Sequence, residues 1–263
     1  MAKLTDVSRL CLHTFTTKPW TLREAIENYT AEDIPAITVW REHYEDIGPA
    51  EAAKMLHDSP LKIASLCRGG FFPATSGAAR EEARTKNRRI IDEAATLGAP
   101  LVVLVCGACP DIPLAESRQH ILDGIVAILP HAQDAGVKLA IEPLHPMYAG
   151  DRSAINTLEQ AVNIVTAMPS PYLGIAVDVY HLWWDPYLRA EIERAGKNIF
   201  AFHVSDWRIP TRDLLLDRGL MGEGCIDIPQ IRAWVEKAGF TGWIEVEIFS
   251  EDYWAQDQRQ FLH

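Results

Sequence analysis

Three carboxylates and one imidazole stand at the ends of apolar stretches of the chain, where their types and spacing could support chemistry. They are Glu142, Asp178, His203 and Glu247. The stretches that precede them are rich in Ile, Val, Leu and Phe, a pattern typical of strands covered on both faces. Because a charged group at such a place needs a partner, we expect the four side chains to meet.

The alternation of side chains along these stretches places the four polar residues on matching faces. Successive residues of a strand point to opposite faces, and in a closed barrel the inner face lines a narrow interior. In each stretch the bulky residues lie on one face and the polar residue lies on the other. In the last stretch Glu245 lies on the same face as Glu247. Three alanines lie one layer below the polar residues: Ala140, Ala176 and Ala201. This pattern predicts open space at the top of a barrel interior.

Three carboxylates that converge in a partly dry site repel one another and raise one another's pKa unless a cation balances them. Carboxylate oxygens with one imidazole suit Mn²⁺, Mg²⁺ or Co²⁺ better than a thiolate-rich zinc site would. Any one such residue alone is more often an exposed charge at a strand end, whereas four with matching parity indicate a metal site. The sequence therefore predicts one bound divalent ion.

Composition narrows the class of protein. The chain has 263 residues and a net charge of −11, which is poorly suited to binding a phosphate backbone, so nucleic acid is not expected as a partner. Five cysteines, odd in number and scattered through apolar stretches, indicate a reducing compartment. Residues 1–6 lack the apolar run of a signal peptide, and no stretch approaches the length of a membrane span. We expect a cytoplasmic protein without a membrane partner.

The elements that must position the four residues repeat at about thirty residues. Apolar strand-like runs are expected at 9–12, 36–40, 62–67, 101–106, 138–142, 173–178, 199–205 and 243–248, and a helix-forming segment follows each of the first seven. No linker divides the chain. Eight such units predict an α/β protein with a single (β/α)₈ TIM barrel over residues 1–263.

Local signals mark where the helices begin and end. Thr21 with Glu24, and Thr157 with Gln160, have the spacing of capping boxes. Asp185-Pro186 predicts a further helix start, and three glycines fall where helices should stop: Gly98, Gly136 and Gly239. The irregular segments 68–76, 107–113, 145–153, 181–186 and 206–227 all follow a strand, so we expect them to form the walls of a pocket at the catalytic face of the barrel.

Several other residues of reactive types could have either a structural or a functional role. Cys106 and Cys109 have redox spacing without the sequence context of a redox motif, so a structural role is favoured. Glu42 and the pair Trp183-Trp184 could reach substrate or could simply be structural. The histidines that follow strands, His13, His43 and His145, could likewise line the pocket or only form hydrogen bonds.

Five motifs carry a resemblance to a known family: IEP at 141–143, VDVYH at 177–181, HVSDWR at 203–208, GEGCID at 222–227 and GWIEVE at 242–247. In this order and spacing, over nearly the whole length, the chain resembles the xylose isomerase-like TIM barrels. It is most similar to their sugar phosphate isomerase/epimerase group, which includes ketose 3-epimerases, hydroxypyruvate isomerases and inosose dehydratases.

The resemblance implies roles for particular residues. Glu142, Asp178, His203 and Glu247 would be the ligands of one divalent ion, and Glu142 and Glu247 would also be the catalytic groups that move protons. His181 and Arg208 would bind substrate oxygens. The implied function is a metal-dependent isomerase or epimerase of a sugar or sugar-like polyol, acting by proton transfer through a metal-bound enediolate.

The spacing from His203 to Arg208 is closer to the dehydratase pattern than to that of the ketose epimerases. A metal-dependent dehydratase of an inosose or related keto-polyol is therefore the alternative. Two further readings are less favoured: a DNA-repair endonuclease needs more histidines and a basic face, and a non-catalytic sugar-binding barrel would not need all four ligands. The resemblance also allows a homodimer or a homotetramer.

Overall fold

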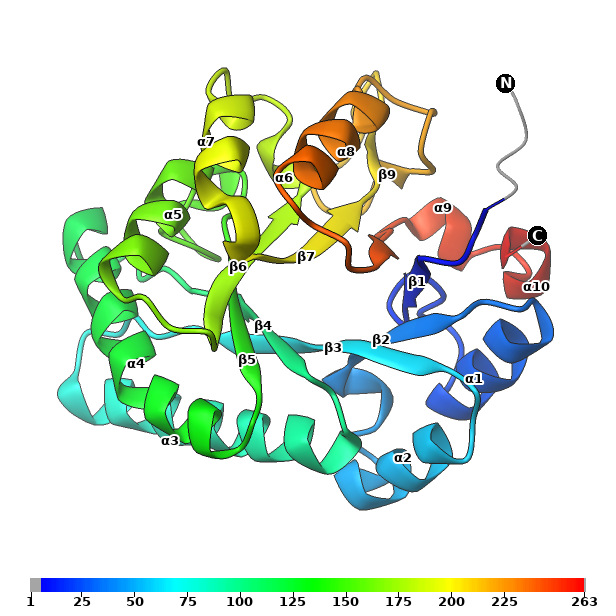
Figure 1. Ribbon diagram of the computed structural model, residues 1–263, viewed down its shortest axis with the longest axis horizontal. Coiled ribbons are helices and arrows are strands. Elements are labelled where there is room, and N and C mark those ends of the chain that lie inside the picture. The colour runs from blue at the N-terminus through cyan, green and yellow to red at the C-terminus, as the bar shows by residue number, and fades with distance from the viewer. Residues whose placement is uncertain (1–5, 263) are drawn as a thin grey trace.

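The computed structural model describes residues 6–262, and residues 1–5 and 263, which the sequence analysis also assigned to the domain, lie outside this range. Eight parallel strands close into a barrel in the order β1-β10-β7-β6-β5-β4-β3-β2, with helices around them (Figure 1). The strands are β1 Leu10–His13, β2 Ala36–Trp40, β3 Lys62–Gly70, β4 Leu101–Val105, β5 Lys138–Glu142, β6 Leu173–Asp178, β7 Ile199–Val204 and β10 Ile244–Val246. The predicted (β/α)₈ barrel is thus confirmed.

The predicted alternation of side chains divides the buried residues into an outer layer and an inner one. Outward residues of the strands, such as Leu139, Ile175 and Phe202, belong to the large cluster that packs against the helices. The three predicted alanines lie in a separate cluster inside the barrel. Small side chains at this level leave space above them, where polar groups can enter from the carboxyl ends of the strands.

Helices follow the strands in the expected order. They are α1 Leu22–Ala31, α2 Gly48–His57, α3 Gly77–Leu97, α4 Leu114–Asp134, α5 Leu158–Ala167, α6 Val179–Leu182, α7 Leu188–Ala195, α8 Ile228–Lys237, α9 Glu251–Trp254 and α10 Gln258–Leu262. Both predicted capping boxes are present, at Thr21 and Thr157. The last helices, α9 and α10, lie beside β1 and α1 (Figure 1), where Arg259 donates a hydrogen bond to Asn28 at 3.0 Å.

Some predicted boundaries were wrong. The helix expected directly after Asp185 begins at Leu188, because the Asp185 carboxylate accepts a hydrogen bond from the amide of Tyr187 and closes a turn first. The last barrel strand ends at Val246, earlier than predicted, so Glu247 lies just beyond it. Gly98, Gly136 and Gly239 do have the positive φ expected where helices end.

The segment between β7 and α8 forms an additional structure over the carboxyl end of the barrel. Its two short strands, β8 Asp206–Trp207 and β9 Arg218–Gly219, pair in antiparallel fashion. The predicted pocket wall at 206–227 therefore contains a hairpin rather than only irregular chain. Among residues 6–262, no helix combines the length and the apolar character needed to cross a membrane.

Candidate metal centre and pocket

The four polar residues of the sequence analysis come together at the carboxyl end of the barrel. Glu142, Asp178, His203 and Glu247 each offer one ligand atom, and these four atoms lie within 4.8 Å of one another. We call these four residues the metal-type group. β5, β6, β7 and the chain just after β10 supply one residue each. Parallel neighbouring strands bring them into register, as the pairing of Asp178 with His203 illustrates.

The chemistry of this group fits a divalent cation. All four side chains are buried, and three of them are carboxylates. Burial raises the pKa of Asp178 to about 7; Arg218 opposes this rise, whereas Glu247 and Glu142 add to it. Burial and the two neighbouring carboxylates thus both disfavour the charged form of Asp178, and a bound cation would offset this. Nδ1 of His203 lies 3.0 Å from Oε1 of Glu142, so the imidazole faces the carboxylates as a ligand would.

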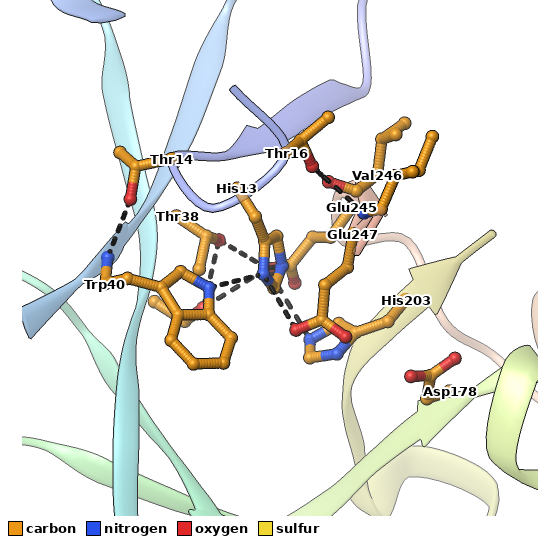
Figure 2. A network of polar contacts seen from close by, with 12 residues as sticks. His13, Thr14, Thr16, Thr38, Trp40, Asp178, His203, Glu245, Val246 and Glu247 are labelled. Atoms are coloured by element: carbon orange, nitrogen blue, oxygen red, sulfur yellow. Dashed lines mark hydrogen bonds and ion pairs between the residues drawn. The ribbon is translucent and has the colours of Figure 1, made fainter. Parts of the chain in front are cut away.

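A second polar network lies beside and below this group, around His13 of β1 (Figure 2). Nδ1 of His13 lies 3.1 Å from Oε1 of Glu247, and Nε2 lies 3.4 Å from Oε2 of Glu245. Burial favours a low pKa for His13, but Glu247 and Glu245 outweigh it and raise the pKa to about 9. Glu245 also accepts hydrogen bonds from Thr38 and Ser65. This buried network holds Glu247 in place from below.

Two alternative groups of metal-ligand type include His13, one with His203 and Glu245 and one with Cys67 and Glu247. His13 is fully buried and also has the indole nitrogen of Trp40 within 3.1 Å of its Nδ1. A cavity of about 250 Å³ reaches the four-residue group through two of its members, Glu142 and Glu247. The residues found only in the alternative groups, His13, Cys67 and Glu245, do not line this cavity. The four-residue group is therefore the one that a small molecule could approach.

Arg218 is a candidate site residue that the sequence reasoning missed. Its Nη1 lies 2.8 Å from Oε2 of Glu247 and 3.4 Å from Oδ2 of Asp178, and its side chain is 2% exposed. The guanidinium lies between the rings of Tyr180 and Phe249, at 4.3 and 4.5 Å from their centroids. The only sequence signal was its place in the segment 206–227, because no local motif distinguishes it from other arginines there.

His181 and Arg208 have different placements. His181 lines the cavity, and its Nε2 lies 3.6 Å from Oδ2 of Asp178 and 3.3 Å from Nη2 of Arg218. Burial and then the charge of Arg218 hold the pKa of His181 well below its usual range. Arg208 does not line the cavity, because its guanidinium pairs with Asp217, Glu223 and Asp252. Arg218, and not Arg208, therefore faces Glu247 and Asp178.

The segment that carries Arg218 is tied to the barrel by several hydrogen bonds. The hydroxyls of Tyr148 and Tyr180 both donate to the carbonyl of Leu214, at 2.9 and 3.0 Å. The fully buried carboxylate of Asp206 accepts hydrogen bonds from three backbone amides, those of Trp207, Gly222 and Ile226. These bonds hold a long segment over the cavity and so fix the position of Arg218.

Comparison with known proteins gives the family. Residues 24–263 match the family model described as xylose isomerase-like TIM barrel. The chain belongs to this family. The recognition made from the motifs is therefore confirmed.

Named relatives of this barrel are enzymes. An inosose isomerase of Halalkalibacterium halodurans is 27% identical over 207 residues, which are 75% of this chain and 69% of that protein. A 3-dehydroshikimate dehydratase of Pseudomonas putida is 26% identical over 249 residues, which are 91% of this chain but 38% of that protein.

Solved structures of similar proteins share the architecture. A Sinorhizobium meliloti protein is 46% identical, with a TM-score of 0.94 over 98% of this chain and 95% of that one. The IolI protein with a zinc atom is 24% identical, with a TM-score of 0.84 over 96% of this chain and 93% of that one. At this identity the second likeness shows the fold alone.

The other residues whose role the sequence analysis left open do not belong to the metal-type group of this xylose isomerase-like barrel. Cys106 is buried and Cys109 half-buried, and both are free thiols. Glu42 lines a second cavity, which shares Arg68 with the cavity at Glu142 and Glu247, but Glu42 does not line that first cavity. His145 packs against the rings of Trp184 and Trp207, beside the hairpin.

Proposed function

We propose that the protein is a divalent-metal-dependent isomerase or epimerase of a sugar or sugar-like polyol. The observation that carries the proposal is the buried group of three carboxylates and one histidine, of which two glutamates face a small cavity. The names of the similar proteins, inosose isomerase and 3-dehydroshikimate dehydratase, support chemistry on a keto-polyol.

Glu142, Asp178, His203 and Glu247 would hold the ion, and we propose Mn²⁺, Mg²⁺ or Co²⁺ on the basis of the oxygen-rich donor set. The zinc named for the IolI structure adds Zn²⁺ to the ions worth testing. When bound, a divalent ion polarises a carbonyl and acidifies the adjacent carbon.

The chain's own residues would then move the proton. Glu142 at the end of β5 and Glu247 just after β10 both reach the cavity, so one can remove a proton from carbon and the other can return it. Return to the opposite face gives an epimer, and return to the neighbouring carbon gives an isomer. His181 and Arg218 would bind substrate oxygens, and the buried charge of Arg218 would stabilise negative charge that develops there.

A dehydratase of an inosose or related keto-polyol is the second candidate. The 3-dehydroshikimate dehydratase relative aligns with 91% of this chain. Dehydration begins with the same removal of a proton next to a carbonyl and ends with loss of a β-hydroxyl, so it needs the same glutamate base. The two candidates differ in their product and share the residues of the site.

Location and assembly stay proposals as well. The free thiols of all five cysteines support a reducing, cytoplasmic location. We propose a small sugar or polyol as the partner, with no role for nucleic acid or membrane, and a homodimer or homotetramer as the assembly to test by light scattering.

Deuterium exchange tests the proposal. Protein loaded with Mn²⁺ is incubated in D₂O with ketoses and inososes, and the substrates are followed by NMR and mass spectrometry. We expect deuterium on the carbon next to the carbonyl, together with an epimer or isomer, whereas a dehydratase releases a product lighter by one water. Glu142→Gln and Glu247→Gln should each lose at least about 10²-fold in rate at saturating metal, because proton transfer contributes on the order of 10²–10⁴-fold.

Glu193→Gln is the matched control, since Glu193 pairs with Arg189 on α7 and lies outside this cavity. It should keep the wild-type rate. Full exchange in both Glu142→Gln and Glu247→Gln would reject the two-glutamate mechanism and leave these residues as ligands only.

A further inference from the structure

Three basic side chains line the cavity without the carboxylate partners that surface cations usually find. They are Lys18, Arg68 and Arg152. Among the described residues, Lys18 and Arg68 form no ion pair within 4.0 Å, and Arg152 reaches only its neighbour Asp151, at 4.0 Å. By contrast, Arg208, Arg212 and Arg218 at the same end of the barrel are each paired with at least two carboxylates.

Aromatic rings hold these three cations in place instead. Arg68 lies over Trp40 at 5.2 Å, and Lys18 lies over Trp254 at 4.5 Å, measured to the ring centroids. Phe15 links the two rings, with its centroid 4.7 Å from that of Trp40 and 5.5 Å from that of Trp254. A cation on an aromatic face keeps its donors free for an anion. The rings therefore present these charges without neutralising them.

The third cation, Arg152, lies in the segment between β5 and α5. Arg152 lies over Tyr148 at 5.3 Å, and Tyr148 in turn packs against His181, with centroids 5.8 Å apart. Arg68 lies on β3 and is connected to Glu247 through Trp40, whose indole nitrogen lies 3.1 Å from His13, and through His13, which contacts Glu247. Positive charge thus reaches the cavity from the ends of several strands.

With a divalent ion bound, the carboxylates of the metal-type group are balanced without Lys18, Arg68 and Arg152. The acidic residues that line the cavity, Glu142 and Glu247, both belong to the metal-type group. A divalent ion and Arg218 supply three positive charges, which balance Glu142, Asp178 and Glu247. Lys18, Arg68 and Arg152 then remain as an excess of three positive charges, in a chain whose net charge is −11. An anion in the cavity would balance part of this excess.

We propose that the substrate is an acidic sugar derivative, with a carboxylate or phosphate group that Arg68, supported by Lys18 and Arg152, binds at the end remote from the reacting carbonyl. This inference rests on the proposed function and narrows it from neutral polyols to keto-sugar acids or sugar phosphates. Arg68 is the principal contact because it is half-buried, on β3, where an ion pair is worth more than at the surface.

Three hexoses test the charge preference while keeping the reacting end constant. D-Fructose, D-fructuronate and D-fructose 6-phosphate share a ketone beside a hydroxyl and differ only at carbon 6, which is an alcohol, a carboxylate or a phosphate. Each is titrated into Mn²⁺-loaded protein by calorimetry, and deuterium exchange is followed in parallel. We expect at least one of the two anions to bind about tenfold or more tightly than D-fructose. The order of the two anions distinguishes a carboxylate from a phosphate substrate.

Variants assign the preference to the basic residues. Arg68→Gln should lower the affinity for the preferred anion about tenfold and leave that for D-fructose within about twofold. The triple variant that adds Lys18→Gln and Arg152→Gln should abolish the preference and its dependence on salt. Arg189→Gln is the matched control, because this exposed arginine of α7 pairs with Glu193 away from the cavity.

Equal binding and exchange of all three hexoses would overturn the charge preference and leave the proposed function intact. So would an anion preference that survives in the triple variant. If none of the three binds or exchanges, the acidic ketose is rejected as substrate, whereas the proposed function is judged separately by deuterium exchange with inososes.

Discussion

At the scale of single residues, the site depends on one buried arginine among carboxylates. Arg218 contacts Glu247 and Asp178, and a buried charge is tolerated only when such partners surround it. Because Arg218 and Arg208 lie in the same segment, they are equivalent in sequence terms and very different in space. Their different surroundings give a direct test of which arginine acts on substrate.

We expect Arg218→Gln to reduce kcat/KM by about 10²-fold or more, because it removes a preorganised charge from the cavity. The same change should raise the affinity for the divalent ion, since a cation 2.8 Å from Glu247 no longer opposes binding. Steady-state kinetics and metal titration would measure the two effects. Arg208→Gln is the comparison and should leave metal affinity unchanged. A larger loss of kcat/KM in Arg208→Gln would restore the assignment made from the sequence.

At the scale of elements, neighbouring barrel strands pack so closely that some positions have no room for a side chain. Gly174 of β6 shows why, since a Cβ built there would lie 2.4 Å from the ring of Phe200 and 2.6 Å from the carbonyl oxygen of Asn198. No flexible side chain end can move away on both sides, because one of the neighbours is backbone. The glycine is therefore required by close packing between β6 and the start of β7.

Gly174→Ala should lower the free energy of unfolding by about 1–3 kcal/mol, the usual cost of overpacking. Chemical denaturation would measure it. Gly150→Ala is the matched control, because a Cβ there meets nothing within 4 Å and its φ is not positive. Equal stability of the two variants would contradict the packing argument.

At the scale of the whole molecule, closing the barrel brings together groups that are far apart in sequence. Four strand ends concentrate negative charge in one place, and the pKa of Asp178 rises to about 7 chiefly because that place is buried. An aspartate whose pKa is raised in the folded state lowers stability at pH values above its unfolded pKa of about 4. Metal binding should recover this cost for the fold as a whole.

Thermal unfolding at neutral pH would measure this. Mn²⁺ at about a hundred times its dissociation constant should stabilise the protein by about 2.7 kcal/mol and so raise Tm by several degrees. Asp178→Asn and His203→Ala should lose most of the rise and of the bound metal, whereas Glu42→Gln should keep both. In the presence of a chelator, Asp178→Asn should melt higher than the wild type, because it removes the buried charge. A wild-type rise in both Asp178→Asn and His203→Ala would place the ion elsewhere.

Alternation along the chain was enough to predict the barrel and the meeting of Glu142, Asp178, His203 and Glu247. Strand periodicity depends on nearest neighbours along the chain, so the inner face, the alanine layer and the positions of Glu142, Asp178 and His203 could be predicted from alternation alone. Capping boxes are equally local, and both were correct. These features need no knowledge of which distant segments meet.

Which other residues reach the site became visible in the folded molecule alone. Arg218 faces Glu247 because the β8–β9 hairpin folds back over the barrel, and hydrogen bonds from Tyr148 and Tyr180 hold that segment there. His13 meets Glu247 because the first and last barrel strands become neighbours when the barrel closes. Both contacts join residues that are far apart in sequence. The path of the chain between them depends on many weak interactions across the fold, which no local sequence pattern can predict.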